Sequence, residues 1–177
     1  MQELKRLGRY LVKNKRCVLA YARQTSDETL QVHVDSDWAG DLLGRKSTTG
    51  VIVRRGKHLL RHMSCLQTLV ALSSGEAEYY ALIRGACTSL GIQSHYQDWM
   101  IDVPIQIYSD SSAARSVARR RGIGGRLRHL QTRHLWLQSR VALGHLKLDV
   151  VAGERNPADT LTKPLPGRKI REWSEHE

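Results

Sequence analysis

Four acidic residues have positions typical of a carboxylate cage for two divalent metal ions. Asp35 and Asp110 each stand at the end of a run with β-strand character, and Glu78 stands near the start of a helical pattern. Asp159 follows an Asn-Pro pair, which is typical of a helix start. Oxygen ligands of this kind bind divalent cations, so convergence of the four acids would create a metal site.

These acids stand out because the chain as a whole is basic. It contains 28 Lys and Arg against 17 Asp and Glu, with a formal net charge of +11 and an isoelectric point near 10. This excess favours a polyanion such as nucleic acid, because Lys and Arg neutralise phosphates and release counterions. An anionic membrane surface is a weaker alternative, since the basic residues do not oppose a Trp and Leu face on one helix. A basic surface that serves only solubility is the third interpretation.

Length and cysteine content limit the class of protein. With 177 residues, 41% of them hydrophobic, the chain can bury one core and is expected to form one globular domain. Its three cysteines are odd in number and form no CxxC pair, which indicates neither a disulfide framework nor a zinc site. We therefore expect an intracellular protein. No apolar run approaches the ~20 residues of a membrane span, and no membrane partner is expected.

Hydrophobic periodicity predicts the elements that must position the acids. The N-terminus has the pattern of an amphipathic helix without a cap, as if cut from something longer. Short β-rich runs lie at residues 17–22, 30–35, 49–54, 58–65, 103–109 and 145–151. Helical patterns lie at 73–90, with a second piece reaching about 100, and at 112–120, 130–141 and 156–163. A three-stranded meander followed by right-handed crossovers implies a mixed five-stranded sheet with helices on its faces.

This arrangement brings two of the acids to one edge of the sheet. If the strands before Asp35 and Asp110 are parallel neighbours, both carboxylates lie at the carboxyl edge, where ligands bind in such folds. On the helix that follows, Glu76 and Glu78 point about 200° apart. Because both lead apolar stripes, the pattern alone does not choose between them.

Simpler structural roles exist for each acid. Asp159 could complement a helix dipole, and Asp110 could cap the helix that follows it. Glu78 could be a partly buried, paired carboxylate, whereas Asp35 is harder to explain because Asp is disfavoured in strands. None of these roles explains why all four acids should meet at one place.

Several ordered motifs resemble the ribonuclease H domain of copia-type LTR retrotransposon polyproteins. The match runs from about residue 30 to residue 166. Any one motif would be weak, but the ordered set is specific. The segments that carry the resemblance are VDSDWAGD at 34–41, RKSTTG at 45–50, VALSSGEAEY at 70–79, IYSD at 107–110 and PADTLTKPL at 157–165.

The resemblance implies a ribonuclease H-like α/β fold and cleavage of the RNA strand of RNA–DNA hybrids. It implies a connection segment from reverse transcriptase at 1–28, the domain itself at 29–166 and a tail at 167–177. Asp35, Glu78, Asp110 and Asp159 match the family's catalytic and metal-binding acids, which selects Glu78 over Glu76 by analogy. The implied cofactor is two Mg²⁺ ions, with Mn²⁺ as an alternative. Implied partners are the hybrid and the reverse transcriptase portion of the polyprotein, in a cytoplasmic retrotransposon particle or the nucleus.

In the implied mechanism, Asp35 and Asp159 hold the ion that activates water, while Asp35, Glu78 and Asp110 hold the ion at the leaving oxygen. The chain departs from cellular ribonucleases H before the last acid. Residues 151–156 form a short segment without the expected His, so Glu154 or no residue takes that role. Gly75 also replaces a hydroxyl residue, and Ser111-Ser112 replace a common Asn-Gln.

Substrate binding is expected from a basic segment around residues 119–134 and from two basic residues near the metal site. Hybrids are recognised by shape and 2′-hydroxyls, so sequence specificity should be low. The His pair at 129 and 134 matches the family and could contact phosphate, or could be partly exposed helix-end residues. The expected nucleic-acid-binding residues are Arg45, Lys46, Arg119, Arg120, Arg121, Arg126, Arg128, His129, Arg133 and His134.

Two other functions remain open on the same fold. A degenerate element could keep the domain only as a nucleic-acid-binding or polymerase-docking module. An integrase-like nuclease acting on DNA is disfavoured, because the glutamate here precedes the second aspartate in the sequence.

Overall fold

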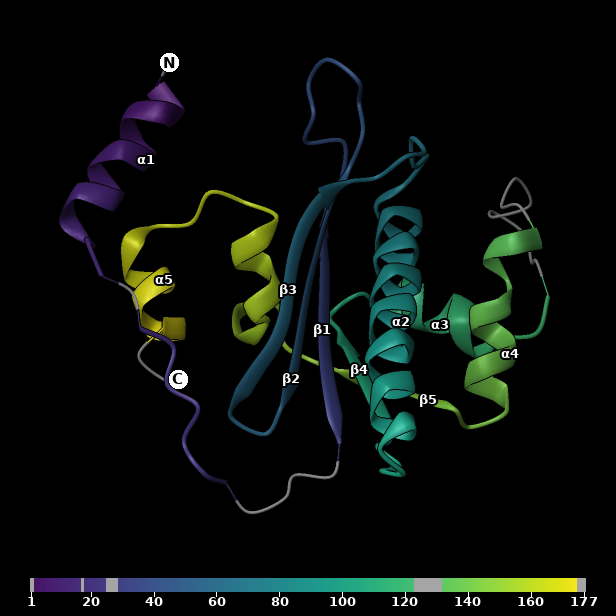
Figure 1. Cartoon of the computed structure of the whole chain (residues 1–177). Coiled ribbons are helices and arrows are strands. Elements are labelled where there is room, and N and C mark those ends of the chain that lie inside the picture. The colour runs from purple at the N-terminus through teal and green to yellow at the C-terminus, as the bar shows by residue number, and fades with distance from the viewer. Residues whose placement is uncertain (1, 17, 25–28, 123–131, 175–177) are drawn as a thin grey trace.

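The computed structural model of the chain describes residues 2–16, 18–24, 29–122 and 132–174. A central sheet has α-helices against one face and short helices on the other side (Figure 1). The elements in chain order are α1 (Gln2–Lys13), β1 (Leu30–Asp37), β2 (Thr48–Arg55), β3 (His58–Leu66), α2 (Ser74–Asp98), β4 (Ile105–Ser109), α3 (Ser112–Arg119), η2 (Thr132–His134), α4 (Trp136–Ala142), β5 (Leu146–Val150), η3 (Gly153–Arg155), η4 (Pro157–Leu161) and α5 (Gly167–Ser174).

The sheet has five strands in the order β3-β2-β1-β4-β5. The strands β1, β2 and β3 form the antiparallel meander, whereas β4 is parallel to β1 and β5 is parallel to β4. This mixed topology confirms the predicted sheet. Because β1 and β4 are parallel neighbours, their carboxyl ends reach the same edge.

The core lies between the sheet and α2, as the alternation in β1 requires. Val32 and Val34 are fully buried on this face, together with Leu82 and Ala86 of α2. The helix approaches β1 closely at Gly85, where an added Cβ would lie 2.5 Å from Val34 Cγ1. The opposite face of β1 therefore carries the odd-numbered residues, including Asp35.

The helix α2 begins as the capping pattern predicts. Ser73 is the N-cap, and its side chain accepts a hydrogen bond from the Glu76 N–H at 3.2 Å. The helix then runs without interruption to Asp98, whereas we expected a first helix to about residue 90 and a separate second piece. Ile92 and Tyr96 continue to pack against the core, which extends the apolar face past the expected end.

The prediction of a strand at residues 17–22 is wrong for its described part. Residues 18–22 have no regular structure, although they lie against the end of the β2–β3 hairpin. The Tyr21 hydroxyl donates to the Leu59 carbonyl at 2.9 Å, and His58 Nε2 lies 2.7 Å from the Ala22 carbonyl. Side chains, rather than a backbone ladder, therefore make these contacts.

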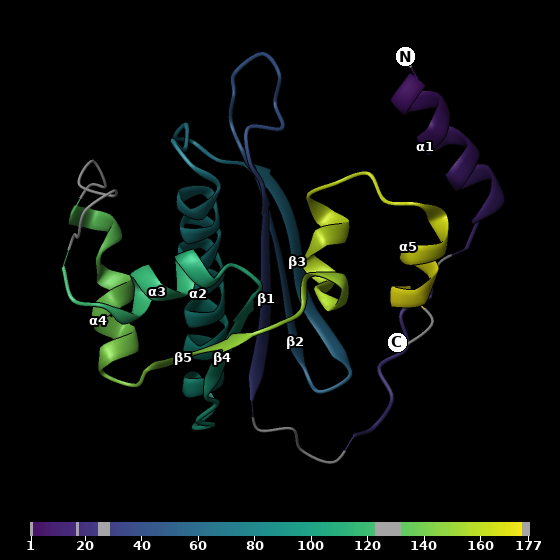
Figure 2. The same cartoon turned by 180° about the vertical axis from the view of Figure 1, so that it is seen from behind.

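The helices expected at 130–141 and 156–163 are shorter than predicted. The first consists of η2 and α4 in its described part, and residues 130–131 lie outside the described residues. The second is only the five-residue 3-10 helix η4, whose N-cap is Asn156. Figure 2 shows the C-terminal helices on the side of the sheet opposite α2, with α1 beyond them. Within the described residues, the structure contains no helix that is both long and apolar enough to cross a membrane.

Candidate metal centre

Three of the four predicted acids come together at the carboxyl edge of the sheet. Asp35 lies in β1, Asp110 follows β4, and Glu78 projects from the first turns of α2. One carboxylate oxygen from each lies within 4.8 Å of the other two. Ligand atoms at this spacing can coordinate one cation, so the structure forms a candidate metal centre, here called the three-acid cluster.

Glu78 has the environment that most clearly suits a cation. Its Oε1 accepts hydrogen bonds from the Ser36 N–H at 3.1 Å and the Ser36 hydroxyl at 2.8 Å. Its Oε2 is buried and has no hydrogen-bond partner. Burial, followed by repulsion from Asp35 and Asp110, raises the pKa of Glu78 to about 7. A buried carboxylate oxygen is costly without a partner, and a hard divalent ion would satisfy it.

Asp35 is held in place by a residue that follows η4. The residue is 3% exposed, and the Thr162 hydroxyl donates a hydrogen bond to its Oδ2. Burial raises the pKa of Asp35, although the Thr162 bond and the Lys163 charge oppose this effect. One oxygen of Asp35 is thereby fixed by the protein.

Asp110 is the exposed member of the cluster. It lies beside the short segment that follows β5, where a Cβ added to Gly153 would be 3.1 Å from Asp110 Oδ2. This segment forms η3, and its Glu154 is exposed. Glycine thus allows the segment without a His to pass close to the cluster.

Asp159 is near the other acids but is not part of the three-acid cluster. The Lys163 ammonium lies 2.8 Å from Asp159 Oδ1 and 3.8 Å from Asp35 Oδ2. Partial burial disfavours the charge of Lys163, but the hydrogen bond to Asp159 and the charge of Asp35 outweigh it and raise the pKa of Lys163. The fourth acid therefore shares a lysine with Asp35, and the metal ion expected between these two acids stays a prediction.

Packing of η4 against the sheet sets the position of Asp159. Asn156 Nδ2 donates to the Val34 carbonyl at 2.9 Å, and Asn156 Oδ1 caps the Ala158 N–H at 3.2 Å. Gly50 pairs with Asp35 across β1 and β2, and an added Cβ there would lie 2.7 Å from the Ala158 carbonyl oxygen. Glycine at this position allows η4 to sit directly on the strands.

Glu76 and Glu78, which the pattern could not separate, have different environments. Glu76 is 1% exposed and does not belong to the cluster. Its Oε1 accepts from the Tyr80 hydroxyl at 2.8 Å, and its Oε2 accepts from the Leu72 N–H at 2.9 Å. Glu76 is therefore a buried structural carboxylate at the helix start.

Sequence reasoning missed several residues around the acids. Ser36 and Thr162 orient the carboxylates, Lys163 pairs with Asp159, and Asn156 and Gly50 seat η4. Ser36 directly follows Asp35, and Thr162-Lys163 lies inside the motif that contains Asp159. Nearness to a candidate acid within a motif was the signal that could have found them.

The predicted nucleic-acid-binding residues fall into three groups: the loop after β1, the end of α3, and the basic segment that follows α3 in the sequence. Arg45 and Lys46 lie in the loop after β1, where Arg45 N donates to the Asp41 carbonyl at 2.8 Å. The Arg119 guanidinium donates to the Leu148 carbonyl at 2.6 Å, whereas Arg120 and Arg121 are exposed.

The rest of this basic segment is only partly described. The His134 ring packs edge-on against Tyr80 with centroids 5.1 Å apart. The His134 carbonyl accepts a hydrogen bond from the Tyr79 hydroxyl at 2.8 Å. Arg126, Arg128, His129 and the side chain of Arg133 lie outside the described residues.

Two sequence relatives are transposon polyproteins. The chain is 32% identical over 146 residues to the retrovirus-related Pol polyprotein from transposon TNT 1-94 of Nicotiana tabacum, covering 82% of this chain. It is 31% identical over 174 residues to the retrovirus-related Pol polyprotein from transposon RE1 of Arabidopsis thaliana, covering 93% of this chain. The chain spans 11% of the length of each relative. No model of a known protein family matches the chain.

Solved structures with the same fold are ribonuclease H domains. LC11-RNase H1 in complex with an RNA/DNA hybrid superposes with a TM-score of 0.51 at 19% identity, covering 75% of this chain and 93% of that one. The N-terminal RNase H domain of a Mycobacterium tuberculosis protein gives a TM-score of 0.54 at 15% identity, covering 82% and 98%. The homologues of this chain are therefore retrovirus-related Pol polyproteins of copia-type transposons, and its fold is the ribonuclease H fold.

Proposed function

We propose that this chain is a metal-dependent ribonuclease H that cleaves the RNA strand of RNA–DNA hybrids during retrotransposon reverse transcription. The observation that carries the proposal is the convergence of Asp35, Glu78 and Asp110, together with a buried Glu78 oxygen that has no hydrogen-bond partner. The hybrid bound to LC11-RNase H1, a protein of the same fold, supports this substrate class. The Pol relatives support the role in reverse transcription.

The three-acid cluster would hold one Mg²⁺, with Mn²⁺ as the alternative, because its donors are all carboxylate oxygens. A bound ion of this kind supplies Lewis-acid stabilisation of phosphate oxygens and lowers the pKa of coordinated water. Ser36 orients Glu78, and Thr162 orients Asp35, so the protein presents both carboxylates in fixed positions. Asp110 is the exposed acid and would complete the set from the solvent side.

Asp35 and Asp159 are the proposed ligands of a second ion. In the structure, the Lys163 ammonium lies between them, so Lys163 would have to turn away when that ion binds. Its side chain is 45% exposed, which leaves room for this movement. Lys163 would then be free to contact a substrate phosphate.

The hybrid would be bound by backbone contacts with basic side chains. Arg120 and Arg121 are exposed beyond α3, and Arg45 is exposed in the loop after β1. Because such contacts release counterions, hybrid affinity should fall steeply as salt rises. We also propose that the domain works beside the reverse transcriptase portion of its polyprotein, inside the cell, in a cytoplasmic particle or the nucleus.

A second candidate function is a nucleic-acid-binding or polymerase-docking module without catalysis. The observation that favours it is the Lys163 ammonium, which occupies the space between Asp35 and Asp159. Under this alternative the basic surface would bind the hybrid, and the acids would serve only the local structure.

The two functions separate in one experiment. The full chain is incubated with end-labelled RNA–DNA hybrid, double-stranded DNA or double-stranded RNA, in Mg²⁺ or in EDTA, and binding is measured in parallel by filter retention. The proposal predicts Mg²⁺-dependent cuts in the RNA of the hybrid alone. Hybrid binding without cleavage over a wide Mg²⁺ range would support the module instead, and cleavage of double-stranded DNA would contradict both.

A further inference from the structure

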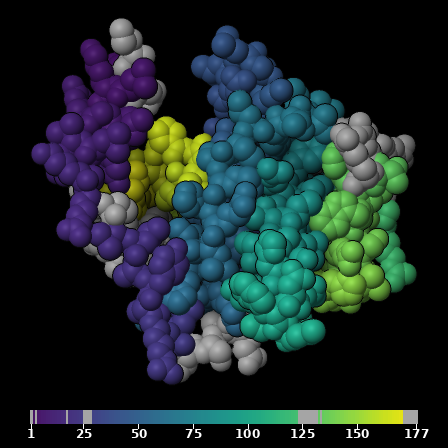
Figure 3. All heavy atoms as spheres, viewed as in Figure 1, coloured from purple at the N-terminus to yellow at the C-terminus, as the bar shows by residue number. Residues whose placement is uncertain are grey.

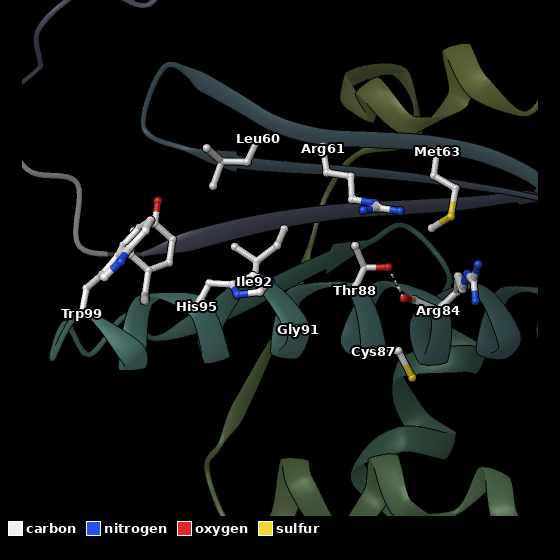
Figure 4. A pocket seen from close by; sticks show the side chains of 11 residues that line it. Leu60, Arg61, Met63, Arg84, Cys87, Thr88, Gly91, Ile92, His95 and Trp99 are labelled. Atoms are coloured by element: carbon white, nitrogen blue, oxygen red, sulfur yellow. Dashed lines mark hydrogen bonds between the residues drawn. The ribbon is translucent and has the colours of Figure 1, made fainter.

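A groove between β3 and α2 has no part in the proposed reaction. The two elements lie side by side on one face of the molecule, and no other described segment covers them there (Figure 3). Between them is a cavity of about 550 Å³. Figure 4 shows Leu60, Arg61 and Met63 of β3 pointing toward Thr88 and Ile92 of α2 across this groove.

The strand beside the groove has an edge that is open beyond its first residues. β3 is the outermost strand of the sheet, and it is nine residues long. Its inner edge pairs with β2. Among the described residues, the one hydrogen bond to the backbone of β3 from a segment other than β2 is that of the Tyr21 hydroxyl to the Leu59 carbonyl. Such an edge presents a row of unpaired N–H and C=O groups that can accept another strand.

The side chains of the groove indicate which side chains a strand bound beside β3 should carry. The apolar lining of the groove includes Trp99 at one end, Ile92 toward the middle and Met63 at the other end (Figure 4). Its basic residues are Arg61, Arg84 and His95, its other titratable residues are Cys87 and Tyr96, and no Asp or Glu lines it. An extended segment with apolar and acidic side chains would complement both features.

A smaller cavity continues the groove toward the start of α2. It has a volume of about 280 Å³ and shares Arg84 and Cys87 with the first cavity. At its far end, the Gln67 side-chain nitrogen donates to the Thr49 hydroxyl and the Ala77 carbonyl, both at 2.9 Å. The Gln67 Oε1 is buried and has no hydrogen-bond partner.

We propose that the β3–α2 groove binds an extended acidic peptide segment of a partner protein, which adds to β3 as a sixth strand. A strand of about eight residues would span β3, at ~3.4 Å per residue. A single-stranded nucleic acid could pair with the basic side chains, but its backbone does not supply alternating donors and acceptors to the edge. A second copy of this chain is disfavoured, because each copy carries a net charge of +11.

The test is a titration of the isotope-labelled full chain, observed by amide chemical shifts. The probe is the blocked octapeptide Glu-Glu-Ile-Ile-Glu-Glu-Ile-Ile, which places both residue types on both faces of an extended strand. We expect shifts at amides of residues 58–66 and along the groove side of α2. Two further peptides each have one of the two alternating sets of amides N-methylated. At least one of them should bind at least about fivefold more weakly, because it cannot complete the ladder. Binding of both at the affinity of the parent peptide would overturn strand addition.

Charge recognition is tested with two single variants. Arg84→Glu changes an exposed residue shared by both cavities and should weaken peptide binding at least about fivefold. Lys147→Glu changes an exposed residue of β5 and should leave binding within about twofold. No shifts at β3 with millimolar peptide would overturn the proposal. So would an equal loss of binding in both variants, or stronger shifts of the same amides by single-stranded octathymidylate.

Discussion

The three-acid cluster and the Asp159–Lys163 pair lie near each other, but they differ in whether a basic side chain of the protein neutralises the carboxylates. Asp159 has a lysine ammonium 2.8 Å away, supplied four residues later on the same segment. Within the described residues, neither Glu78 nor Asp110 takes part in an ion pair, and burial raises the pKa of Glu78 to about 7. The comparison teaches that one lysine of the chain neutralises Asp159 and lies near Asp35, whereas Glu78 and Asp110 have no such cation beside them among the described residues.

The largest effect is expected from a change of Asp35, because this acid belongs to the three-acid cluster and also lies near Lys163. Asp35→Asn should lower hybrid cleavage by about a thousandfold or more, because several kcal/mol of charge stabilisation depend on this ligand. Hybrid affinity should stay within a few fold, since basic residues supply the binding. Single-turnover cleavage and filter binding measure the two quantities. Retained turnover would refute the role of Asp35, and lost binding would indicate a disturbed fold.

Two matched variants on α2, at Glu78 and Glu76, test the difference between a cluster acid and a structural acid through the free energy of unfolding. Glu78→Gln should abolish cleavage yet stabilise the metal-free protein near pH 8, by at most about 3 kcal/mol, because it removes a buried charge whose pKa is raised to about 7. Glu76→Gln should instead destabilise the protein by about 1–3 kcal/mol, because Leu72 N and Tyr80 donate to that carboxylate. Urea unfolding measures both changes. The same sign for the two variants would contradict the division of roles.

The expected pH dependence of metal binding follows from the raised pKa of the Glu78 carboxyl. Because the folded pKa of Glu78 is about 7 and its ordinary value is 4.5, its contribution to stability is fully present below about 4.5 and is lost as pH rises through 7. Mg²⁺ favours the ionised form, so it should raise the melting temperature more at pH 8 than at pH 5.5. Thermal unfolding with and without Mg²⁺ at both pH values measures this. A shift of equal size at both pH values would argue against ionisation of the cluster.

The smallest expected effect concerns the lysine. Lys163→Met removes a positive charge 3.8 Å from Asp35 Oδ2 and should lower the Mg²⁺ concentration at half-maximal cleavage by about two- to fivefold. The matched control is Lys169→Met, which changes a lysine on α5 that forms no ion pair within the described residues. A higher Mg²⁺ requirement for Lys163→Met would show that the lysine assists metal binding rather than competing with it.

The edge where Asp35 and Asp110 meet could be predicted because it depends on short-range signals. Alternation within residues 30–35 and 103–109, together with a crossover helix between parallel strands, places both acids at one end of the sheet. The choice between Glu76 and Glu78 could not be predicted from the pattern. It depends on Ser36, a partner 42 residues away in the chain, and on the burial that follows folding.

The other differences share a physical reason. The β-rich run at 17–22 has strand propensity, but its described part has only side-chain contacts with the hairpin. The segment after Asn156 was expected to be an α-helix through residue 163, but it forms five residues of 3-10 helix. Tertiary contacts decide such short segments more than local propensity does.

The most direct test of the central claim is a titration of the isotope-labelled full chain with substoichiometric Mn²⁺, observed by paramagnetic broadening of backbone amides. If the three-acid cluster is the cation site, broadening should be strongest at Ser36, Glu78 and Ser111, which lie in or beside the cluster. Excess Mg²⁺ should reverse it. Broadening centred instead on the exposed acids Asp98 and Asp102, with no effect at the cluster, would contradict the account.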